Sequence, residues 1–347
     1  MQFQRVNEAI DAIKKGEMII MMDDEDRENE GDLVCAAAFC TPEKINFMIS
    51  EARGLVCVSV SSEDAQRLAL KPMVEENNSQ HGTAFTVTID AKACTTGISA
   101  FERDLTIRKM VESTSKPEDF VRPGHIFPLI AKEGGVLVRT GHTEGSVDLC
   151  KLAGIAPMAV ICEITKKDGH MARREDLLEF AKEHRLKILY VSDLVEYRMH
   201  HETLLTLKSQ CTSEFLGKPA KRYVFIDHQQ REHTLYGFGN FLENPLVRYH
   251  VISDDLSLLE NEKKYSILMH SIKRIQEEGG LIIFMDGKQN SALEVRNLGI
   301  GAQMLRFLGI VDFRLLSSEE NREYIGLSGF GLNIKERIII EAEPITL

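Results

Sequence analysis

The chain has 347 residues, enough for about two domains that each bury a core of their own. Its 53 acidic and 42 basic residues leave a net charge of −11, which argues against a nucleic-acid partner because phosphate binding depends on clustered Lys and Arg. Seven irregularly spaced cysteines predict no disulfide framework, and no apolar run approaches the roughly 20 residues that span a bilayer. We therefore expect a reduced, cytoplasmic protein with no membrane partner.

Helical and strand patterns alternate over the first part of the chain. Val6, Ile10 and Ile13 recur at helical spacing before Gly16, and the apolar run 18–22 predicts the first strand. The same criteria place strands near 33–39, 55–60, 85–89, 135–139, 159–164 and 187–191, and helices near 43–52, 99–112, 144–153 and 173–184. This alternation predicts an α/β or α+β domain.

The pattern becomes polar around residues 200–221 and then resumes. In the second half we expect strands at 223–227, 234–238, 247–252 and 281–285, and helices at 266–278 and 295–308. The expected division is a first domain at residues 1–200, a linker at 201–220 and a second domain at 221–347.

The acidic segment 23–32 directly follows the first predicted strand. It gathers Glu28, Asp32 and other carboxylates around Arg27. Like charges that are partly buried repel one another, so we expect a cation among them, most simply Mg²⁺ together with Arg27. A solvated acidic turn is the alternative, although a second apolar strand follows at once. An EF-hand calcium loop does not fit, because Asn29 stands where its glycine is required and Cys35 where its glutamate is required.

A predicted strand and a predicted helix are joined by the motif Arg139-Thr140-Gly141-His142-Thr143-Glu144. Free N–H groups and the dipole at a helix N-terminus suit a phosphate or carboxylate, and Thr143 is the expected N-cap. Arg139 would add a planar, bidentate phosphate donor. His142 can bind a metal or move a proton. A single histidine is more often structural, but this junction favours a functional one.

Two further side chains are candidates for proton transfer. His125 follows a Pro-Gly pair, and we expect a turn there that fixes its direction; a buried histidine bonded to a backbone carbonyl is the alternative. Glu163 lies in the apolar strand 158–164, where burial would raise its pKa into the range of a general acid or base. A carboxylate that faces water is the alternative. The segment Thr95-Thr96-Gly97-Ile98-Ser99 is supporting evidence only, because any ordinary helix start offers the same groups.

Together, the acidic segment, Thr96-Gly97-Ile98-Ser99-Ala100, Arg122-Pro123-Gly124-His125, the 139–144 motif and Val147-Asp148-Leu149 closely resemble 3,4-dihydroxy-2-butanone 4-phosphate synthase of riboflavin biosynthesis. The resemblance implies a homodimer that converts D-ribulose 5-phosphate to L-3,4-dihydroxy-2-butanone 4-phosphate and formate, with Mg²⁺ or Mn²⁺ and no organic cofactor. It implies that Glu28 and His142 bind the metal and that His125 and Glu163 are essential for catalysis. The implied substrate contacts are Arg27, Glu28, Asp32, Arg139, Thr140, Gly141, His142, Thr143 and Glu163.

The second half resembles GTP cyclohydrolase II at residues 294–303 and 326–332. That family holds a catalytic zinc with three cysteines, whereas Ser253 stands where the first is expected and no cysteine follows Cys211. We therefore expect no zinc and an inactive second domain. Two alternatives remain: a bifunctional protein that still hydrolyses GTP, with ligands such as His250 and Asp254, and a regulatory or interaction module. The expected fold is α+β, with a mixed sheet in an α/β synthase domain and a second α/β domain.

Overall fold

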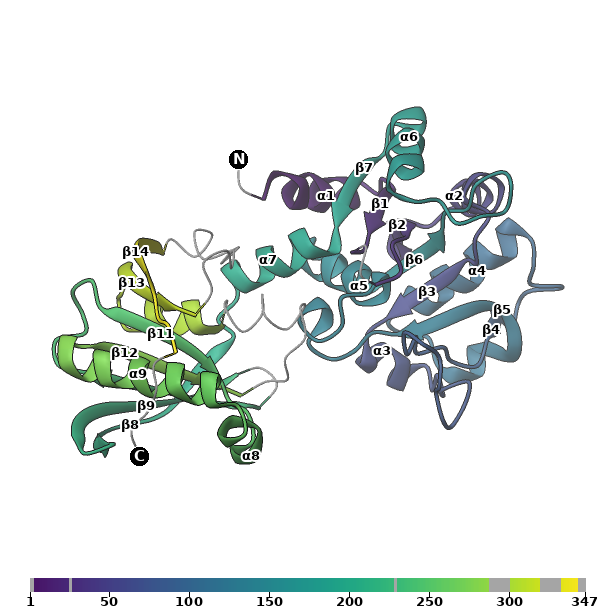
Figure 1. Cartoon of the computed structure of the whole chain (residues 1–347). Helices are drawn as coiled ribbons and strands as arrows, with labels where there is room; N and C mark the ends of the chain where they lie inside the picture. The colour runs from purple at the N-terminus through teal and green to yellow at the C-terminus, as the bar shows by residue number, and fades with distance from the viewer. Residues whose placement is uncertain (1–2, 25–26, 228–229, 287–299, 319–331, 343–347) are drawn as a thin grey trace. The chain divides into compact units, whose positions relative to one another are not determined.

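The computed structural model describes residues 3–24, 27–227, 230–286, 300–318 and 332–342. The chain divides into two compact units, an N-terminal unit (Met1–Tyr197) and a C-terminal unit (Arg198–Leu347), both drawn in Figure 1. No helix within the described ranges is long and apolar enough to cross a membrane.

A mixed seven-stranded sheet forms the centre of the N-terminal unit, in the order β4-β5-β3-β6-β2-β1-β7. β1 is parallel to β7 and β3 is parallel to β5, whereas the other neighbours are antiparallel. The strands are β1 (Ile19–Met22), β2 (Gly31–Ala36), β3 (Cys57–Val60), β4 (Ile89–Ala91), β5 (Phe120–Ile130), β6 (Met158–Glu163) and β7 (Lys187–Tyr190).

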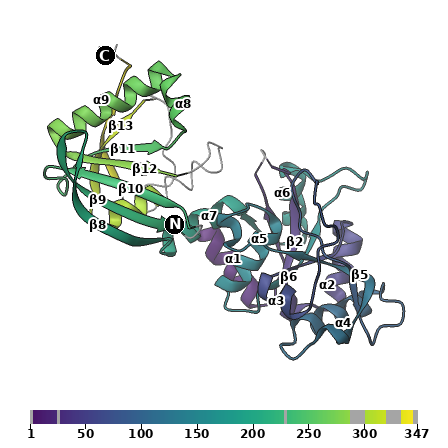
Figure 2. The ribbon, with the colours of Figure 1, turned by 90° about the horizontal axis from the view of Figure 1, so that it is seen from below.

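β1, β2 and β3 are buried at every position because helices cover both faces of this sheet. Alternate strand residues such as Ile20 and Val58 share one core with α2, α4 and α6. On the other face, the hydroxyls of Ser59 and Ser146 on α5 lie 2.7 Å apart. Figure 2 shows α1 and α5 on one side of β2 and β6, and α2 and α4 on the other. The helices are α1 (Gln4–Lys14), α2 (Pro42–Phe47), α3 (Ser62–Arg67), α4 (Ala100–Val111), α5 (His142–Leu152), α6 (Arg174–His184) and α7 (Val191–His201).

The strand register places two acidic residues side by side on the α5 face of the sheet. Asp32 of β2 is the antiparallel partner of Glu163 of β6, and side chains directly opposite each other in such a pair point to the same face. α5 begins at His142. The strand register and the start of α5 thus bring Asp32, Glu163 and His142, which are far apart in the sequence, to the same face of the sheet.

Three expected elements in the N-terminal unit are wrong. Residues 135–139 form a short 3-10 turn (Gly135–Leu137) rather than a strand. The Pro-Gly pair before His125 lies within β5, opposite an irregularity in its pairing with β4, which is where a strand tolerates a residue without an N–H. The expected strand at 85–89 is reduced to isolated bridges at Phe85 and Thr86, and β4 begins only at Ile89.

A second mixed seven-stranded sheet forms the C-terminal unit, in the order β14-β13-β11-β12-β10-β9-β8. One face packs on α9, where Ile267, Ile272 and Ile275 share a core with Leu246 and Ile282 of the sheet. Residues 300–307 are also helical. The elements are β8 (Leu205–Phe215), β9 (Lys218–Asp227), β10 (Glu232–Phe238), β11 (Leu246–Val251), α8 (Asp255–Leu259), α9 (Glu262–Glu278), β12 (Gly280–Met285), β13 (Asp312–Ser317) and β14 (Asn333–Ile339).

The expected linker at residues 201–220 is wrong, because β8 and the start of β9 occupy it as a hairpin. β8 is the edge strand of its sheet, and most of its side chains are exposed. Its polar composition therefore reflects an exposed edge strand and not an unstructured connection. α7 runs across the division between the two units after Tyr197.

Candidate active site

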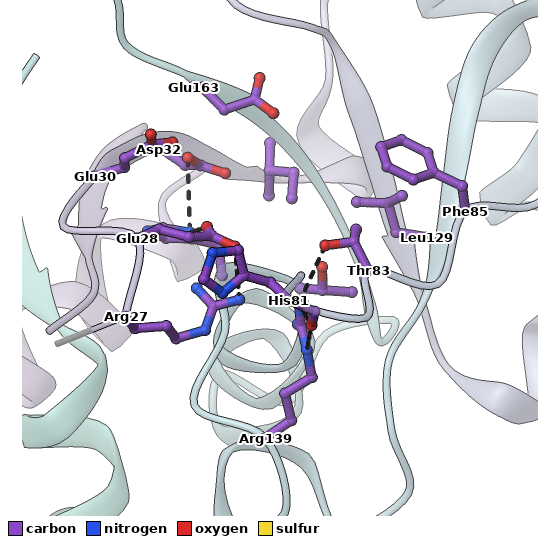
Figure 3. A pocket seen from close by; sticks show the side chains of 13 residues that line it. Arg27, Glu28, Glu30, Asp32, His81, Thr83, Phe85, Leu129, Arg139 and Glu163 are labelled. Carbon is purple, nitrogen blue, oxygen red and sulfur yellow. Dashed lines mark hydrogen bonds and ion pairs between the residues drawn. The ribbon is translucent and has the colours of Figure 1, made fainter. Parts of the chain in front are cut away.

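A cavity of about 370 Å³ opens in the N-terminal unit between the acidic segment, the N-terminus of α5 and the strands β5 and β6. Figure 3 shows charged side chains on one side of it and Phe85 and Leu129 on another. The lining residues are Arg27, Glu28, Glu30, Asp32, His81, Thr83, Phe85, Leu129, Arg139, His142, Thr143, Ile161 and Glu163.

Asp23 organises the acidic segment from below. Its carboxylate is fully buried and accepts a hydrogen bond from Nη1 of Arg27 at 2.6 Å. It also accepts the backbone N–H groups of Glu28 at 3.2 Å and Glu30 at 2.8 Å. Arg27 in turn pairs with Glu28 at 2.9 Å. The described residues of the segment therefore surround a buried carboxylate, and the alternative of a solvated acidic turn is wrong.

His142 lies between two carboxylates, with its Nδ1 at 3.7 Å from Glu28 and 3.8 Å from Asp32. Burial lowers the pKa of His142, but the charge of Asp32 and the contact with Glu28 outweigh it and raise this pKa to about 9. Burial raises the pKa of Asp32 to about 7 against the opposing effect of His142. For Glu28, burial is outweighed by His142 and Arg27, and its pKa falls to about 2.

The arrangement fits a divalent metal ion. Asp23, Glu28 and His142 each offer a ligand atom, and these atoms lie within 4.8 Å of one another. Nε2 of His142 and Oδ1 of Asp32 are buried without a hydrogen-bond partner, a costly state that a bound cation would relieve. Carboxylate oxygens with one imidazole suit Mg²⁺ or Mn²⁺. The predicted ligands Glu28 and His142 are thus brought together, and Asp23 joins them.

Glu163 lines the cavity, as expected of a proton-transfer group. Its Oε2 accepts the backbone N–H of Leu55 at 2.8 Å. A Cβ at Gly54 would collide with Glu163, so glycine is needed there for the chain to pass. This bond fixes the position of Oε2.

His125, the other expected catalytic residue, does not line this cavity. Its Nδ1 lies 2.7 Å from Oδ2 of Asp90, and its backbone N–H donates to Oδ1 of the same carboxylate at 2.8 Å. The ring is 44% exposed. The alternative of a buried histidine bonded to a carbonyl is therefore wrong, because the partner is a carboxylate and the ring reaches solvent.

The N-terminus of α5 differs from expectation in its cap. Gly141 is the N-cap and offers no side-chain bond, whereas Thr143 already lies inside the helix and lines the cavity. Thr140 and Gly141 connect Arg139 to His142 without lining the cavity. Arg139 is not a free bidentate donor, because its guanidinium is engaged by Glu144 at 2.6 Å and by the 81–83 stretch.

The weak motif at residues 95–99 has a structural role. Ser99 caps α4 by accepting the N–H of Glu102 at 3.2 Å. The Glu102 carboxylate accepts the N–H of Gly97 at 2.8 Å and the hydroxyl of Thr95 at 2.8 Å. These bonds close a loop at the helix start and account for the hydroxyl residues.

Several residues of the site were not among the individually predicted ones: Glu30, His81, Thr83, Phe85, Leu129 and Ile161 line the cavity, and Asp23 lies beside the predicted metal ligands without lining it. A histidine beside a glycine in the long polar stretch 75–83 was a usable signal for His81, since loops of this kind often carry functional side chains. The apolar members gave no signal, because nothing in their sequence separates a cavity wall from a core.

In the C-terminal unit, the described residues contain no group of three His, Cys, Asp or Glu that could hold a metal. Asp254 caps α8, accepting the N–H of Ser257 at 2.9 Å and its hydroxyl at 2.6 Å. His250 is buried beside the ring of Phe284, with ring centroids 5.5 Å apart. The expected similarities at 294–303 and 326–332 lie largely outside the described residues.

The comparisons with known proteins match both halves of the chain. The family model for 3,4-dihydroxy-2-butanone 4-phosphate synthase matches residues 7–197, and that for GTP cyclohydrolase II matches residues 287–339. The chain is 74% identical, over the full length of both proteins, to the 3,4-dihydroxy-2-butanone 4-phosphate synthase of Wolinella succinogenes. It is 42% identical to the riboflavin biosynthesis protein RibBA of Bacillus mycoides, covering 98% of this chain and 94% of the relative.

A solved relative matches the fold over nearly the whole of both chains. RibBX from A. baumannii, a two-domain 3,4-dihydroxy-2-butanone 4-phosphate synthase, superposes with a TM-score of 0.84 at 39% identity, covering 98% of this chain and all of that one. The predicted α+β class is confirmed. The matches define a two-domain enzyme whose N-terminal unit has the synthase fold. The chain belongs to the 3,4-dihydroxy-2-butanone 4-phosphate synthase family.

Proposed function

We propose that the N-terminal unit converts D-ribulose 5-phosphate to L-3,4-dihydroxy-2-butanone 4-phosphate and formate, a step of riboflavin biosynthesis, with Mg²⁺ or Mn²⁺ as cofactor. The observation that carries the proposal is that Glu28 and His142 line one cavity with Glu163, and that ligand atoms of Glu28, His142 and Asp23 lie within 4.8 Å of one another. A solved 3,4-dihydroxy-2-butanone 4-phosphate synthase holds two magnesium ions; it is 40% identical, with a TM-score of 0.54, over 55% of this chain and 95% of its own.

Each polar group then has a task in the reaction. When bound, the divalent ion would stabilise the negative charge that develops on the sugar oxygens after a proton leaves the carbon beside the ketone. Glu163 accepts or returns protons at Oε1 while Leu55 fixes Oε2. Arg27 and Thr143 contact the substrate, and Asp32, which lies beside Glu163, also takes part in proton transfer. The five-carbon substrate leaves as a four-carbon ketone phosphate and formate, with no net gain or loss of water.

We propose that the protein is a cytoplasmic homodimer. In this dimer, His125 takes part in the reaction at the cavity of the second copy of the chain. Gly97 lies against His125 and Asp90, and the neighbouring side chains Ile98 and Phe101 are 53% and 71% exposed. Exposed apolar side chains around a reactive group are typical of an interface. We therefore propose that His125 of one chain completes the cavity of its partner.

A mixing experiment tests this arrangement. If His125 acts across the dimer, a one-to-one mixture of His125→Asn and Glu163→Gln chains, refolded together, should recover about a quarter of wild-type activity, because half of the dimers are mixed and each has one intact site. Either variant alone should be nearly inactive. If His125 acts within its own chain, every mixed site carries one defect, and the mixture should be as inactive as its components.

We further propose that the C-terminal unit does not hydrolyse GTP. The proposal is supported by the absence of cysteine after Cys211 and by the use of Asp254 as a helix cap, since zinc in that chemistry is held by cysteines. Incubating the full chain separately with ribulose 5-phosphate and with GTP tests both proposals. We expect formate and the ketone phosphate from ribulose 5-phosphate, and no product from GTP. A lack of product from ribulose 5-phosphate would contradict the first proposal, and release of pyrophosphate from GTP would contradict the second.

A further inference from the structure

Two buried carboxylates on α5, Glu144 and Asp148, have no task in the proposed metal site. They are 1% and 3% exposed, and a buried carboxylate is costly unless hydrogen-bond donors surround it. Oε1 of Glu144 accepts the N–H of Lys132 at 3.0 Å, and Oδ2 of Asp148 accepts the N–H of Val136 at 2.8 Å. The two acids are one helical turn apart, so they fasten the segment 132–139 along α5.

Glu144 also fixes the direction of Arg139. Its Oε2 lies 2.6 Å from Nη1 of Arg139, with the two side chains 1% and 17% exposed. Nε and Nη2 of Arg139 donate to the carbonyl of His81 at 3.3 and 3.2 Å, and Nη2 donates to the hydroxyl of Thr83 at 3.2 Å. One bond to Glu144, two to His81 and one to Thr83 engage four of the five N–H groups of the guanidinium.

The stretch that Arg139 holds is a wall of the cavity, because His81 and Thr83 both line it. The preceding residues 71–80 are exposed. Asn77 donates to the carbonyl of Thr83 at 2.8 Å, and the N–H of Gly82 donates to the carbonyl of Ser79 at 3.0 Å. These two bonds shape the loop internally, and its base is attached to β5, where the N–H of Ile130 donates to the carbonyl of Ala84 at 3.1 Å. Arg139 provides an attachment to the helix that carries His142.

We propose that Glu144 is a positioning residue for the reaction, which acts through Arg139 to hold the 81–83 wall at the separation from the metal ligands that the substrate requires. The kinetic part of this inference rests on the proposed function. Glu144→Gln keeps the size of the side chain and an acceptor for the N–H of Lys132, but it removes the charge that orients the guanidinium. Thr83→Val removes only the hydroxyl that accepts a hydrogen bond from Arg139 at the other end of this chain of contacts.

The test uses the full chain with Glu144→Gln, Thr83→Val and the two changes combined. For Glu144→Gln, the KM for ribulose 5-phosphate should rise on the order of tenfold or more, as for other residues that orient a site from behind. Amide hydrogen exchange of residues 76–84, measured without substrate, should become faster. The double variant should lose less than the product of the two single losses, because both changes act through one guanidinium.

Asp104→Asn is the matched control, since Asp104 is a carboxylate 1% exposed that pairs with Arg108 at 2.9 Å on α4 and does not line the cavity. It should lower the melting temperature and leave both KM and loop exchange unchanged. If Glu144→Gln behaves like this control, or if the loss in the double variant equals the product of the two single losses, Glu144 is only structural. Thr83→Val serves if Glu144→Gln fails to fold, and unchanged KM and loop exchange in that variant would overturn the proposal. If wild type shows no turnover, the proposed function fails, and exchange of the loop alone decides the brace.

Discussion

The buried carboxylate of Asp23 offers a quantitative test of the acidic loop. Asp23→Asn keeps the shape of the side chain but removes its charge. The bond to Arg27 at 2.6 Å is lost as a charge-assisted contact, and such bonds contribute about 1.5–3 kcal/mol. Arg27 keeps Glu28 as a second partner at 2.9 Å, so its charge does not remain uncompensated. We therefore expect the lower half of that range, about 2 kcal/mol.

This loss predicts two separate measurements. By calorimetry, the melting temperature of the N-terminal unit should fall by roughly 4–8 °C, since about 1 kcal/mol corresponds to 2–4 °C for a unit of this size. By titration calorimetry, affinity for Mg²⁺ should fall by about 10- to 100-fold, because Asp23 is both a potential ligand and the support of Glu28.

Asp104→Asn separates the two effects. Asp104 pairs with Arg108 at the same four-residue spacing as Asp23 with Arg27, but it does not belong to the group of candidate metal ligands. It should lower stability and leave Mg²⁺ affinity unchanged. An Asp23→Asn protein that binds Mg²⁺ as tightly as wild type would refute the assignment of Asp23 to the metal site, whatever its melting temperature.

Four further outcomes are expected. Glu163→Gln and His125→Asn should each lower turnover on the order of 10²-fold or more with Mg²⁺ affinity unchanged by calorimetry, as expected for lost proton-transfer groups; abolished metal binding would contradict this division of roles. A chain that ends at Tyr197, whose ring packs on Phe3 with centroids 5.4 Å apart, should retain synthase activity, and elemental analysis of the full chain should find no stoichiometric zinc. Burial, with the charges of Arg248 and Lys264, lowers the pKa of His250 to about 4. As the pH falls, the unfolded chain binds a proton at His250 from about pH 6.5, whereas the folded unit binds it only near pH 4. The free energy of unfolding of the C-terminal unit should therefore decrease by up to about 1.4 kcal/mol for each pH unit that the pH is lowered from 6.5 to 4. The unfolding free energy obtained from hydrogen exchange of β11 should not show this pH dependence in His250→Phe.

The proposed metal ligands Glu28 and His142 could be predicted from sequence because their chemistry is local. An acidic run after an apolar strand and a Gly-His-Thr turn each signal a site without knowledge of the fold. Asp23 could not be singled out, because its neighbours in the run carry the same charge. Only the fold distinguishes it, by burying its carboxylate completely beneath Arg27.

The missed elements have physical causes of the same kind. The apolar run 135–138 predicts a strand, but Gly134 and Gly135 adopt φ of +88° and +61°, which ends any extended conformation, and a Cβ at Gly135 would collide with Asp148. The tie to Asp148 depends on a residue a dozen positions away. The polar side chains of β8 predict a linker, yet its backbone pairs with β9 from Leu205 to Phe215, with one irregularity between Leu207 and Ser209. In both cases tertiary contacts outweigh local composition.

The central claim is that Asp23, Glu28 and His142 hold the metal ion on which turnover of ribulose 5-phosphate depends. Titration of metal-free protein with Mn²⁺, followed by electron paramagnetic resonance for binding and by formate release for activity, tests it most directly. In wild type, the two signals should rise together and reach a plateau at the same Mn²⁺ concentration. In His142→Ala, both should be lost while hydrogen exchange of β2 and β6 remains native. Formate release at the wild-type rate from His142→Ala, or from wild type in excess chelator, would contradict the account.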